Sequence, residues 1–147
     1  MTAPPPPASV RLEDWPQRLN AVLRAARTRV FDWGDHDCGM HAADGAAAVT
    51  GVDPGADLRG RYSDYMGGMR RLQALTGART LKGWADSLFP RTPPALAARG
   101  DWALVRLPSV PGGRPHPALA ICDGERLSCP TGVRRPMSDA LICWRVG

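Results

Sequence analysis

The stretch Phe31-Asp32-Trp33-Gly34-Asp35-His36-Asp37-Cys38 leads into an alanine-rich run from Met40 to Val49. That run is nearly free of charge, and a helix that is apolar on most of its faces is typical of the centre of a domain. Gly51 and Pro54 mark its end, because glycine favours the left-handed C-cap conformation and proline cannot continue a helix. We therefore predict a buried central helix with Cys38 in its first turn.

A cysteine at the start of a helix has special chemistry. Unpaired backbone N–H groups and the helix dipole stabilise a thiolate, which lowers the thiol pKa. Gly34 permits a sharp turn close to a substrate, and Asp37 is suited to cap the helix. Cys38 is therefore a candidate nucleophile; the alternative is a cysteine that only packs in the core.

The rest of the chain is predicted to form helices and then strands. Helices are expected from Asp14, as N-cap, to about Arg29, then at 68–75 and 81–88, with a turn and short helix at 58–65 and a linker at 91–98. Strands are expected at 102–107, 118–122, 126–129 and 141–146. Asp123-Gly124, between the second and third strands, is a strong hairpin signal. This order predicts an α+β domain with N-terminal helices packed on a C-terminal antiparallel sheet.

Composition narrows the class of protein. The length of 147 residues favours a single domain at 11–147, preceded by a proline-rich extended arm at 1–10. No apolar run reaches the ~18 residues of a membrane span, and the N-terminus lacks the pattern of a secretory signal. The net charge of +5 comes from scattered arginines rather than from a basic stripe with interleaved aromatics. We expect neither membrane insertion nor a nucleic-acid partner.

The cysteines give no sign of a metal site. All four (Cys38, Cys122, Cys129 and Cys143) lack C-x-x-C spacing, so we expect reduced thiols, no metal and no cofactor. An iron–sulfur site built from Cys122, Cys129 and Cys143, with or without Cys38, is a further hypothesis, although this spacing matches no common cluster signature.

The residues around Cys38 resemble the nucleophile motif of NlpC-type papain-like cysteine peptidases. Those enzymes have an aromatic residue, then Trp-Gly, then Asp-Cys at the start of the central helix, and this chain has Phe31, Trp33-Gly34 and Asp37-Cys38. Residues 99–105 resemble their Gly-Asp turn into the first strand, and 118–124 resemble the strand and hairpin that carry their catalytic histidine. The resemblance implies a papain-like (NlpC-type) fold with Cys38 as nucleophile.

The chain departs from that family at the catalytic base. Ala118 stands where the peptidases have their histidine, and the nearest histidine is His116. The spacing of two keeps His116 on the same strand face if the strand extends that far. Pro115 and Pro117 flank it and disfavour regular strand pairing there. His116 is nevertheless the candidate base.

Other polar side chains complete the candidate set. The resemblance implies that the residue orienting the histidine falls at Ser128 or Cys129. His36, in the loop beside Cys38, is either an alternative base or a solvated loop residue. His41, one turn into the helix, is expected to pack or cap locally.

The whole chain is similar to a group of small tail proteins of phages and gene-transfer agents, which are related to the same fold and have no well-defined activity. The shared features are Trp33-Gly34-x-x-Asp37-Cys38, Ala42-Ala43-Asp44, Thr50-Gly51-x-Asp53-Pro54, Arg59-Gly60-x-Tyr62, Arg99-Gly100-Asp101 and Trp144-Arg145-Val146.

This resemblance implies a virion structural protein of the tail tip or baseplate. Such a protein is assembled in the bacterial host cytoplasm and contacts other tail-tip proteins, and its peptidase scaffold has lost all or part of the catalytic dyad. The alternative is an active cysteine peptidase, a hydrolase that cleaves peptidoglycan peptides during genome entry. In that case Cys38 attacks the carbonyl and His116 acts as base.

Overall fold

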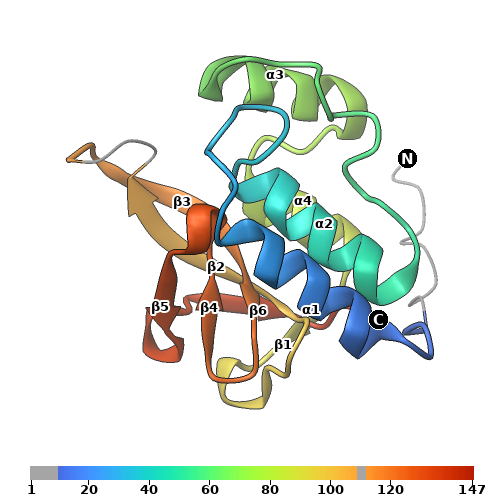
Figure 1. Cartoon of the computed structure of the whole chain (residues 1–147). Coiled ribbons are helices and arrows are strands. Elements are labelled where there is room, and N and C mark those ends of the chain that lie inside the picture. Colours follow the sequence, from blue (N-terminus) through green and yellow to red (C-terminus); the bar gives the residue numbers. More distant parts are fainter. Residues whose placement is uncertain (1–9, 109–111) are drawn as a thin grey trace.

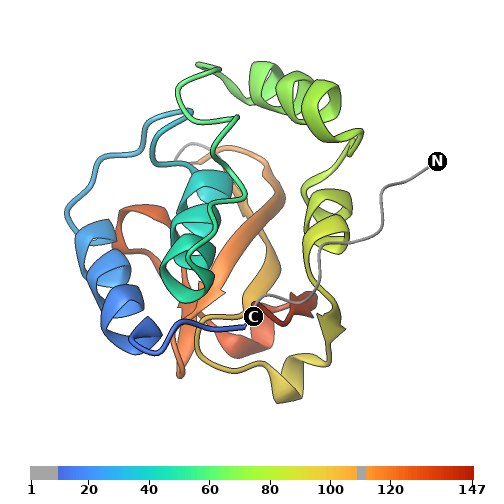
Figure 2. The same cartoon turned by 90° about the vertical axis from the view of Figure 1, so that its right-hand side faces the viewer.

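The computed structural model describes residues 10–108 and 112–147 and confirms the α+β class. Figures 1 and 2 show α1 and α2 side by side against a curled sheet, with α3 at the end of the molecule where α2 begins. The predicted arm at 1–10 lies, apart from Val10, outside the described residues.

The helices agree closely with their predicted positions. They are α1 (Trp15–Ala26), α2 (Cys38–Thr50), α3 (Tyr65–Thr76) and α4 (Leu81–Leu88). α1 ends earlier than expected, and Asp14 stands at its N-cap without capping it, because its carboxylate binds Arg18 at 2.9 Å. Of the turn and short helix expected at 58–65, the turn is confirmed and the separate helix is wrong: residues 58–64 form turns and bends, and Tyr65 already begins α3. Gly51 ends α2 in the left-handed conformation, with a φ of 80°.

The described strands form one antiparallel sheet in the order β1-β6-β2-β3-β4-β5. Their bounds are β1 (Arg91–Thr92), β2 (Trp102–Pro108), β3 (Pro115–Cys122), β4 (Arg126–Ser128), β5 (Arg134–Pro136) and β6 (Ile142–Trp144). β1 and β5 were not predicted, because edge strands of two or three residues are too short to show an alternating pattern. β1 lies within residues 91–98, for which the sequence predicts a linker.

β3 begins three residues earlier than predicted, at Pro115. His116 lies opposite Leu107 of β2, so the flanking prolines do not prevent pairing there. On the other side of β3, only Ile121 and Cys122 pair with β4 within the part of the chain that the structure describes. The first half of β3 therefore has one edge without a partner strand among the described residues, and at such an edge the missing amide donor of proline removes no ladder bond.

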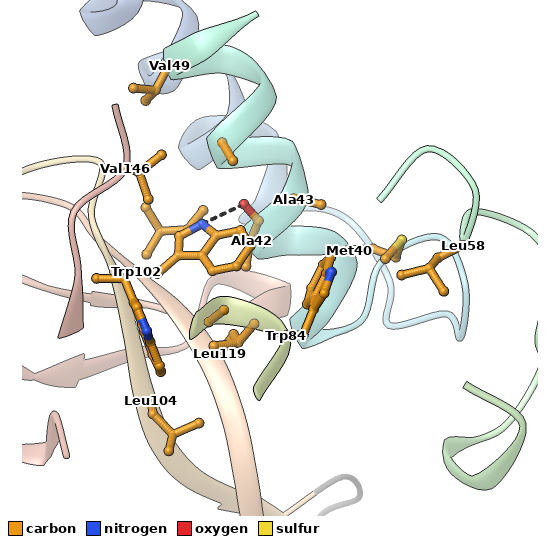
Figure 3. Packing of buried hydrophobic residues seen from close by; sticks show 14 of the residues in the cluster. Met40, Ala42, Ala43, Val49, Leu58, Trp84, Trp102, Leu104, Leu119 and Val146 are labelled. Atoms are coloured by element: carbon orange, nitrogen blue, oxygen red, sulfur yellow. Dashed lines mark hydrogen bonds between the residues drawn. The ribbon is translucent and has the colours of Figure 1, made fainter. Parts of the chain in front are cut away.

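One face of the sheet packs on α2. Trp102, Leu104 and Leu119 belong to this core together with α2 and α4 side chains, and the Trp102 indole donates a hydrogen bond to the Ala42 carbonyl at 2.9 Å (Figure 3). Gly45 allows the close approach of α2, since a Cβ there would lie 2.5 Å from the Ile121 side chain. The core thus fixes α2 directly against β3.

The other face of the sheet carries a second apolar cluster. Its buried members are Ala103, Val105, Ala118, Ala120, Cys122, Leu127, Cys129 and Cys143. Cys38 packs at the margin of this cluster, so the first residue of α2 reaches the face of β3 that does not support the helix.

Candidate functional site

Asp37 organises the loop that precedes α2. One carboxylate oxygen accepts the Met40 amide at 2.9 Å, which is the predicted N-cap. The other accepts the Gly34 amide at 2.9 Å and the Tyr62 hydroxyl. Gly34 has a φ of 80°, and a Cβ there would lie 2.8 Å from the Tyr62 carbonyl oxygen, so a larger residue would disrupt the loop. A single buried carboxylate therefore fixes the backbone on both sides of Cys38.

Cys38 opens α2 at the edge of a groove of about 450 Å³, which we call the Cys38 groove. Its lining is largely apolar and aromatic. Among the residues that line it are Phe31, Trp33, Tyr65, His116, Ala118 and Cys129. Both Cys38 and the candidate base therefore border the same space, whereas their catalytic roles stay predictions.

The thiol of Cys38 is not activated in this structure. Burial raises its pKa to about 12, and the negative charge of Asp37 acts in the same direction. Backbone hydrogen bonds at Leu119, Gly39 and Cys38 itself lower the pKa but do not offset the burial. The lowered pKa expected at a helix N-terminus is therefore wrong here, because removing the sulfur from water disfavours the charged form more than the helix favours it.

His116 lies on the same face of β3 as Ala118, as its spacing predicted. Its Nδ1 lies 3.0 Å from the Pro117 carbonyl oxygen, and its ring centroid is 5.0 Å from that of Tyr65. A carbonyl can only accept, so Nδ1 carries a proton, and in the neutral ring Nε2 is then the nitrogen that can accept one. This tautomer is compatible with a base.

His36 is fully buried, so the solvated-loop interpretation is wrong. Its Nε2 accepts the backbone amide of Thr131 at 3.0 Å. Burial lowers its pKa, and the nearby Arg29 lowers it further. His36 does not line the Cys38 groove among the described residues. We assign it a positioning role for the segment that contains Thr131.

Ser128 binds a different histidine from the one expected. Its buried hydroxyl lies 3.1 Å from Nε2 of His41, so it is engaged away from the proposed base. Burial lowers the pKa of His41 to about 3, with a further contribution from His36. The His41 ring packs against the nearby His36 ring, with 5.6 Å between the centroids, but its hydrogen bond is not local, because Ser128 belongs to β4.

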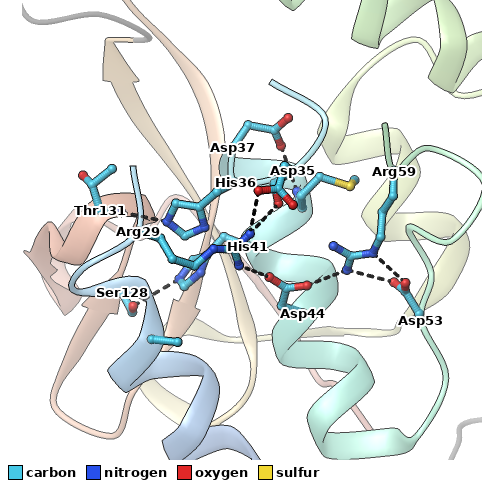
Figure 4. A network of polar contacts seen from close by, with 12 residues as sticks. Arg29, Asp35, His36, Asp37, His41, Asp44, Asp53, Arg59, Ser128 and Thr131 are labelled. Carbon is cyan, nitrogen blue, oxygen red and sulfur yellow. Dashed lines mark hydrogen bonds and ion pairs between the residues drawn. The ribbon is translucent and has the colours of Figure 1, made fainter. Parts of the chain in front are cut away.

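Residues 128–135 form a wall between two cavities. Cys129, Thr131, Val133 and Arg135 line the Cys38 groove, while Ser128, Gly132 and Arg134 line a second cavity on the other side. The bonds from His36 to Thr131 and from His41 to Ser128 attach this wall to α2 and its preceding loop (Figure 4). Sequence reasoning did not find these attachments, which join residues 95 and 87 positions apart.

Comparison with known families assigns the domain. Residues 10–146 match the model of a family described as a domain of unknown function, DUF6950. The chain belongs to the DUF6950 family. The match covers every helix and strand described above. No curated protein and no solved structure matches the chain.

Arginine–aspartate pairs brace the DUF6950 domain beside the Cys38 loop. Arg29 binds Asp35 and Asp44, both at 3.1 Å, and Arg59 binds Asp44 at 2.6 Å and Asp53 at 2.7 Å (Figure 4). These contacts connect the loop before α2, α2 itself and the turn after it. Part of the arginine content is thus accounted for by pairing within the chain.

Metal ligands do not gather in the described parts of the domain. Within 10–108 and 112–147, no group of three or more His, Cys, Asp or Glu side chains could hold a metal ion. All four cysteines are free thiols. Cys122, Cys129 and Cys143 share one apolar cluster, but they are not grouped closely enough to hold a metal ion, so the iron–sulfur hypothesis has no support in the described residues. Among the same residues, no helix is long and apolar enough to cross a membrane.

Proposed function

We propose that this DUF6950 protein is a structural component of a phage-type tail tip, on a papain-like (NlpC-type) scaffold whose catalytic pair is degenerate. The observation that carries the proposal is the state of the nucleophile position. Cys38 opens the central helix, but its thiol has a pKa of about 12, and Ala118 occupies the place expected for the base. A thiol that stays protonated near neutral pH is a poor nucleophile.

The motifs that carry the resemblance to tail proteins support a scaffold role. Trp33-Gly34-x-x-Asp37 contributes the carboxylate that binds Gly34 and Tyr62. Arg59 joins Asp44 and Asp53, which belong to two further motifs. Asp37 also accepts the Met40 amide and Asp44 also binds Arg29, so the polar side chains of these motifs serve contacts within the domain.

The remaining shared motifs connect the two ends of the described domain. The Asp101 carboxylate accepts the Arg11 guanidinium at 3.0 Å, the Val146 amide at 3.1 Å and the Ala98 amide at 2.8 Å. Arg11 also donates to the Arg99 carbonyl at 2.7 Å. A domain whose first and last segments share one buried carboxylate is suited to serve as a rigid building block. Its proposed partners are other tail-tip proteins, and its proposed location is the virion tail after assembly in the host cytoplasm.

A cysteine peptidase acting on peptidoglycan peptides is the second candidate, because Cys38 and His116 border one groove. In that reaction the Cys38 thiol gives its proton to His116 while its sulfur forms a bond to the peptide carbonyl carbon. His116 returns the proton to the departing amine, which leaves a thioester, and water then hydrolyses the thioester. In this candidate reaction, backbone N–H groups at the start of α2 stabilise the oxyanion.

Hydrolysis of peptidoglycan stem peptides separates the two candidates. The wild type, Cys38→Ala and His116→Ala should all be inactive if the domain is a scaffold, and Cys143→Ala serves as the control for loss of a thiol elsewhere. Hydrolysis that disappears in Cys38→Ala but persists in Cys143→Ala would overturn the scaffold proposal. In particles, Cys38→Ala should assemble and infect normally, whereas a loss of infectivity with normal assembly would favour the enzyme.

A further inference from the structure

A second cavity, of about 300 Å³, lies between α1 and the far side of the 128–135 wall. Four arginines border it: Arg24 from the last turn of α1, Arg27 from the C-cap of α1, Arg99 from the turn before β2, and Arg134 from β5. We call it the arginine cavity. It shares no lining residue with the Cys38 groove, so its chemistry is separate from the proposed function.

The acidic side chains of the arginine cavity neutralise only part of this charge. Asp123 accepts Arg134 at 2.8 Å and is further engaged by the backbone amides of Glu125 and Arg126. Glu125 is the other carboxylate in the lining, so four cationic and two anionic side chains leave an excess of two positive charges.

Arg24 and Arg27 carry the unpaired charge. Within 10–108 and 112–147, neither guanidinium makes a hydrogen bond or an ion pair. They lie three residues apart at the end of α1, and because the C-cap Arg27 keeps helical backbone angles, both lie on the same side of the helix. Exposed arginines that make no ion pair are available to bind an incoming anion.

A buried hydroxyl also borders the arginine cavity. Ser128 is 6% exposed, and its Oγ lies 3.1 Å from Nε2 of His41. When the imidazole donates its Nε2 proton to Oγ, the hydroxyl proton of Ser128 can point into the cavity. The lining therefore combines exposed cations with a buried polar group supplied by the wall.

We propose that the arginine cavity binds a small ligand with a doubly negative oxyanion group, of the phosphate monoester or dicarboxylate type. The guanidinium fork matches the paired oxygens of both groups. Two excess positive charges match a dianion, and the volume is at the lower end of the range of about 300–1,000 Å³ for small-molecule sites. It leaves room for an organic body beyond a bare ion.

Calorimetric titration of the full-length protein at constant ionic strength tests this site. The probes are inorganic phosphate, glycerol phosphate and succinate. We expect saturable binding of at least one, with affinity reduced at least ~10-fold in the Arg24→Gln/Arg27→Gln variant. The matched control is Arg70→Gln/Arg79→Gln, which removes the same charge from exposed positions outside the lining and should retain wild-type affinity.

The ranking of the probes identifies the ligand class. Preference for glycerol phosphate assigns a phosphate monoester, and preference for succinate assigns a dicarboxylate. Ser128→Ala should also weaken binding, with its folded state verified by circular dichroism. Absence of saturable binding to all three probes would overturn the proposal, as would an equal loss of affinity in both double-arginine variants, which indicates general charge attraction.

Discussion

The two cavities on either side of the 128–135 wall differ in where their polar groups are directed. Beside the Cys38 groove, the carboxylate of Asp37 and Nε2 of His36 both accept hydrogen bonds from protein donors, and the thiol is kept neutral. In the arginine cavity, Arg24 and Arg27 have no protein partner within the described residues. The groove brings a thiol and an imidazole to one space, whereas the unpaired charge lies on the other side of the wall.

The position of the Cys38 thiol and its reactivity are therefore two separate properties. The sequence motif places a cysteine at a helix start, but reactivity depends on the solvent and the charges around the sulfur. A cavity can resemble an active site in its lining and still lack a reactive group at neutral pH. If the comparison is right, the Cys38 thiol should react slowly, and changes to the residues that hold the loop and the 128–135 wall should change the stability of the domain.

The largest effect is expected from Asp37→Ala. The change removes the α2 N-cap, worth about 1 kcal/mol, and leaves the Gly34 amide and Tyr62 hydroxyl without an acceptor, at about 1–3 kcal/mol each. We expect the free energy of unfolding in urea to fall by about 4 kcal/mol. Asp37→Asn keeps one acceptor oxygen and should lose about half of that. Asp64→Ala, which removes the exposed cap of α3, should cost only about 1 kcal/mol, and an equal loss in both caps would contradict the special role of Asp37.

The second prediction concerns alkylation of Cys38 by iodoacetamide at pH 8. A pKa of about 12 in place of 9.0 lowers the thiolate fraction about 1,000-fold. The greater nucleophilicity of a more basic thiolate recovers a factor of ~20. The rate should therefore be on the order of 50-fold below that of a small free thiol and should rise steeply above pH 10. Asp37→Asn should accelerate alkylation, because it removes a negative charge beside the sulfur. A fast wild-type reaction at pH 7 would show that the groove is activated.

The fold was predictable where the signals are local. The Asp37 cap, the left-handed Gly51 and the apolar α2 between them each depend on neighbours in the sequence, and α2 was placed correctly. The predicted start of β3 was three residues too late. Its first residues include two prolines, which a strand accepts where one of its edges has no partner strand. That edge exists only once the sheet has formed.

The sequence predicted where the candidate site residues lie, but not the pKa of the thiol or the hydrogen-bond partners around it. The i, i+2 spacing correctly placed His116 with Ala118, whereas the pKa of Cys38 moved opposite to the expected direction because burial is a tertiary property. The partner of Ser128 is His41, 87 residues earlier in the chain, and no periodicity or motif connects the two. Arg24 and Arg27 appeared as scattered charge, because the cavity that they border is formed by three separate segments.

The third prediction is a pH dependence caused by His41. Its pKa is about 3 in the folded protein and about 6.5 when unfolded, so below pH 6.5 only the unfolded state takes up the proton. The contribution of His41 to stability is complete above pH 6.5 and is lost as the pH falls. Between pH 7.5 and pH 5 we expect a loss of about 2 kcal/mol in the free energy of unfolding.

His41→Gln isolates this contribution, because glutamine retains a hydrogen-bonding group toward Ser128 but does not titrate. The loss between pH 7.5 and pH 5 should be smaller in this variant by about 2 kcal/mol than in the wild type. His116→Gln, in the groove, is the matched control. If its pH profile changes as much as that of His41→Gln, the wall is not attached through a buried neutral imidazole.

The smallest effect is expected within the wall itself. Thr131 has a φ of 64°, in the left-handed region that a β-branched residue seldom adopts, and this conformation costs about 1 kcal/mol. The backbone amide of Thr131 binds His36, so the strained residue holds the attachment of the wall to the Cys38 loop. Thr131→Asn should raise the free energy of unfolding by about 0.5 kcal/mol, because asparagine tolerates this conformation and keeps the amide donor. Thr131→Ala also removes the hydroxyl bond to the Pro130 carbonyl without gaining that tolerance, so it should not stabilise the protein. If Thr131→Ala raises the free energy of unfolding as much as Thr131→Asn does, the effect comes from the lost hydroxyl rather than from the backbone conformation.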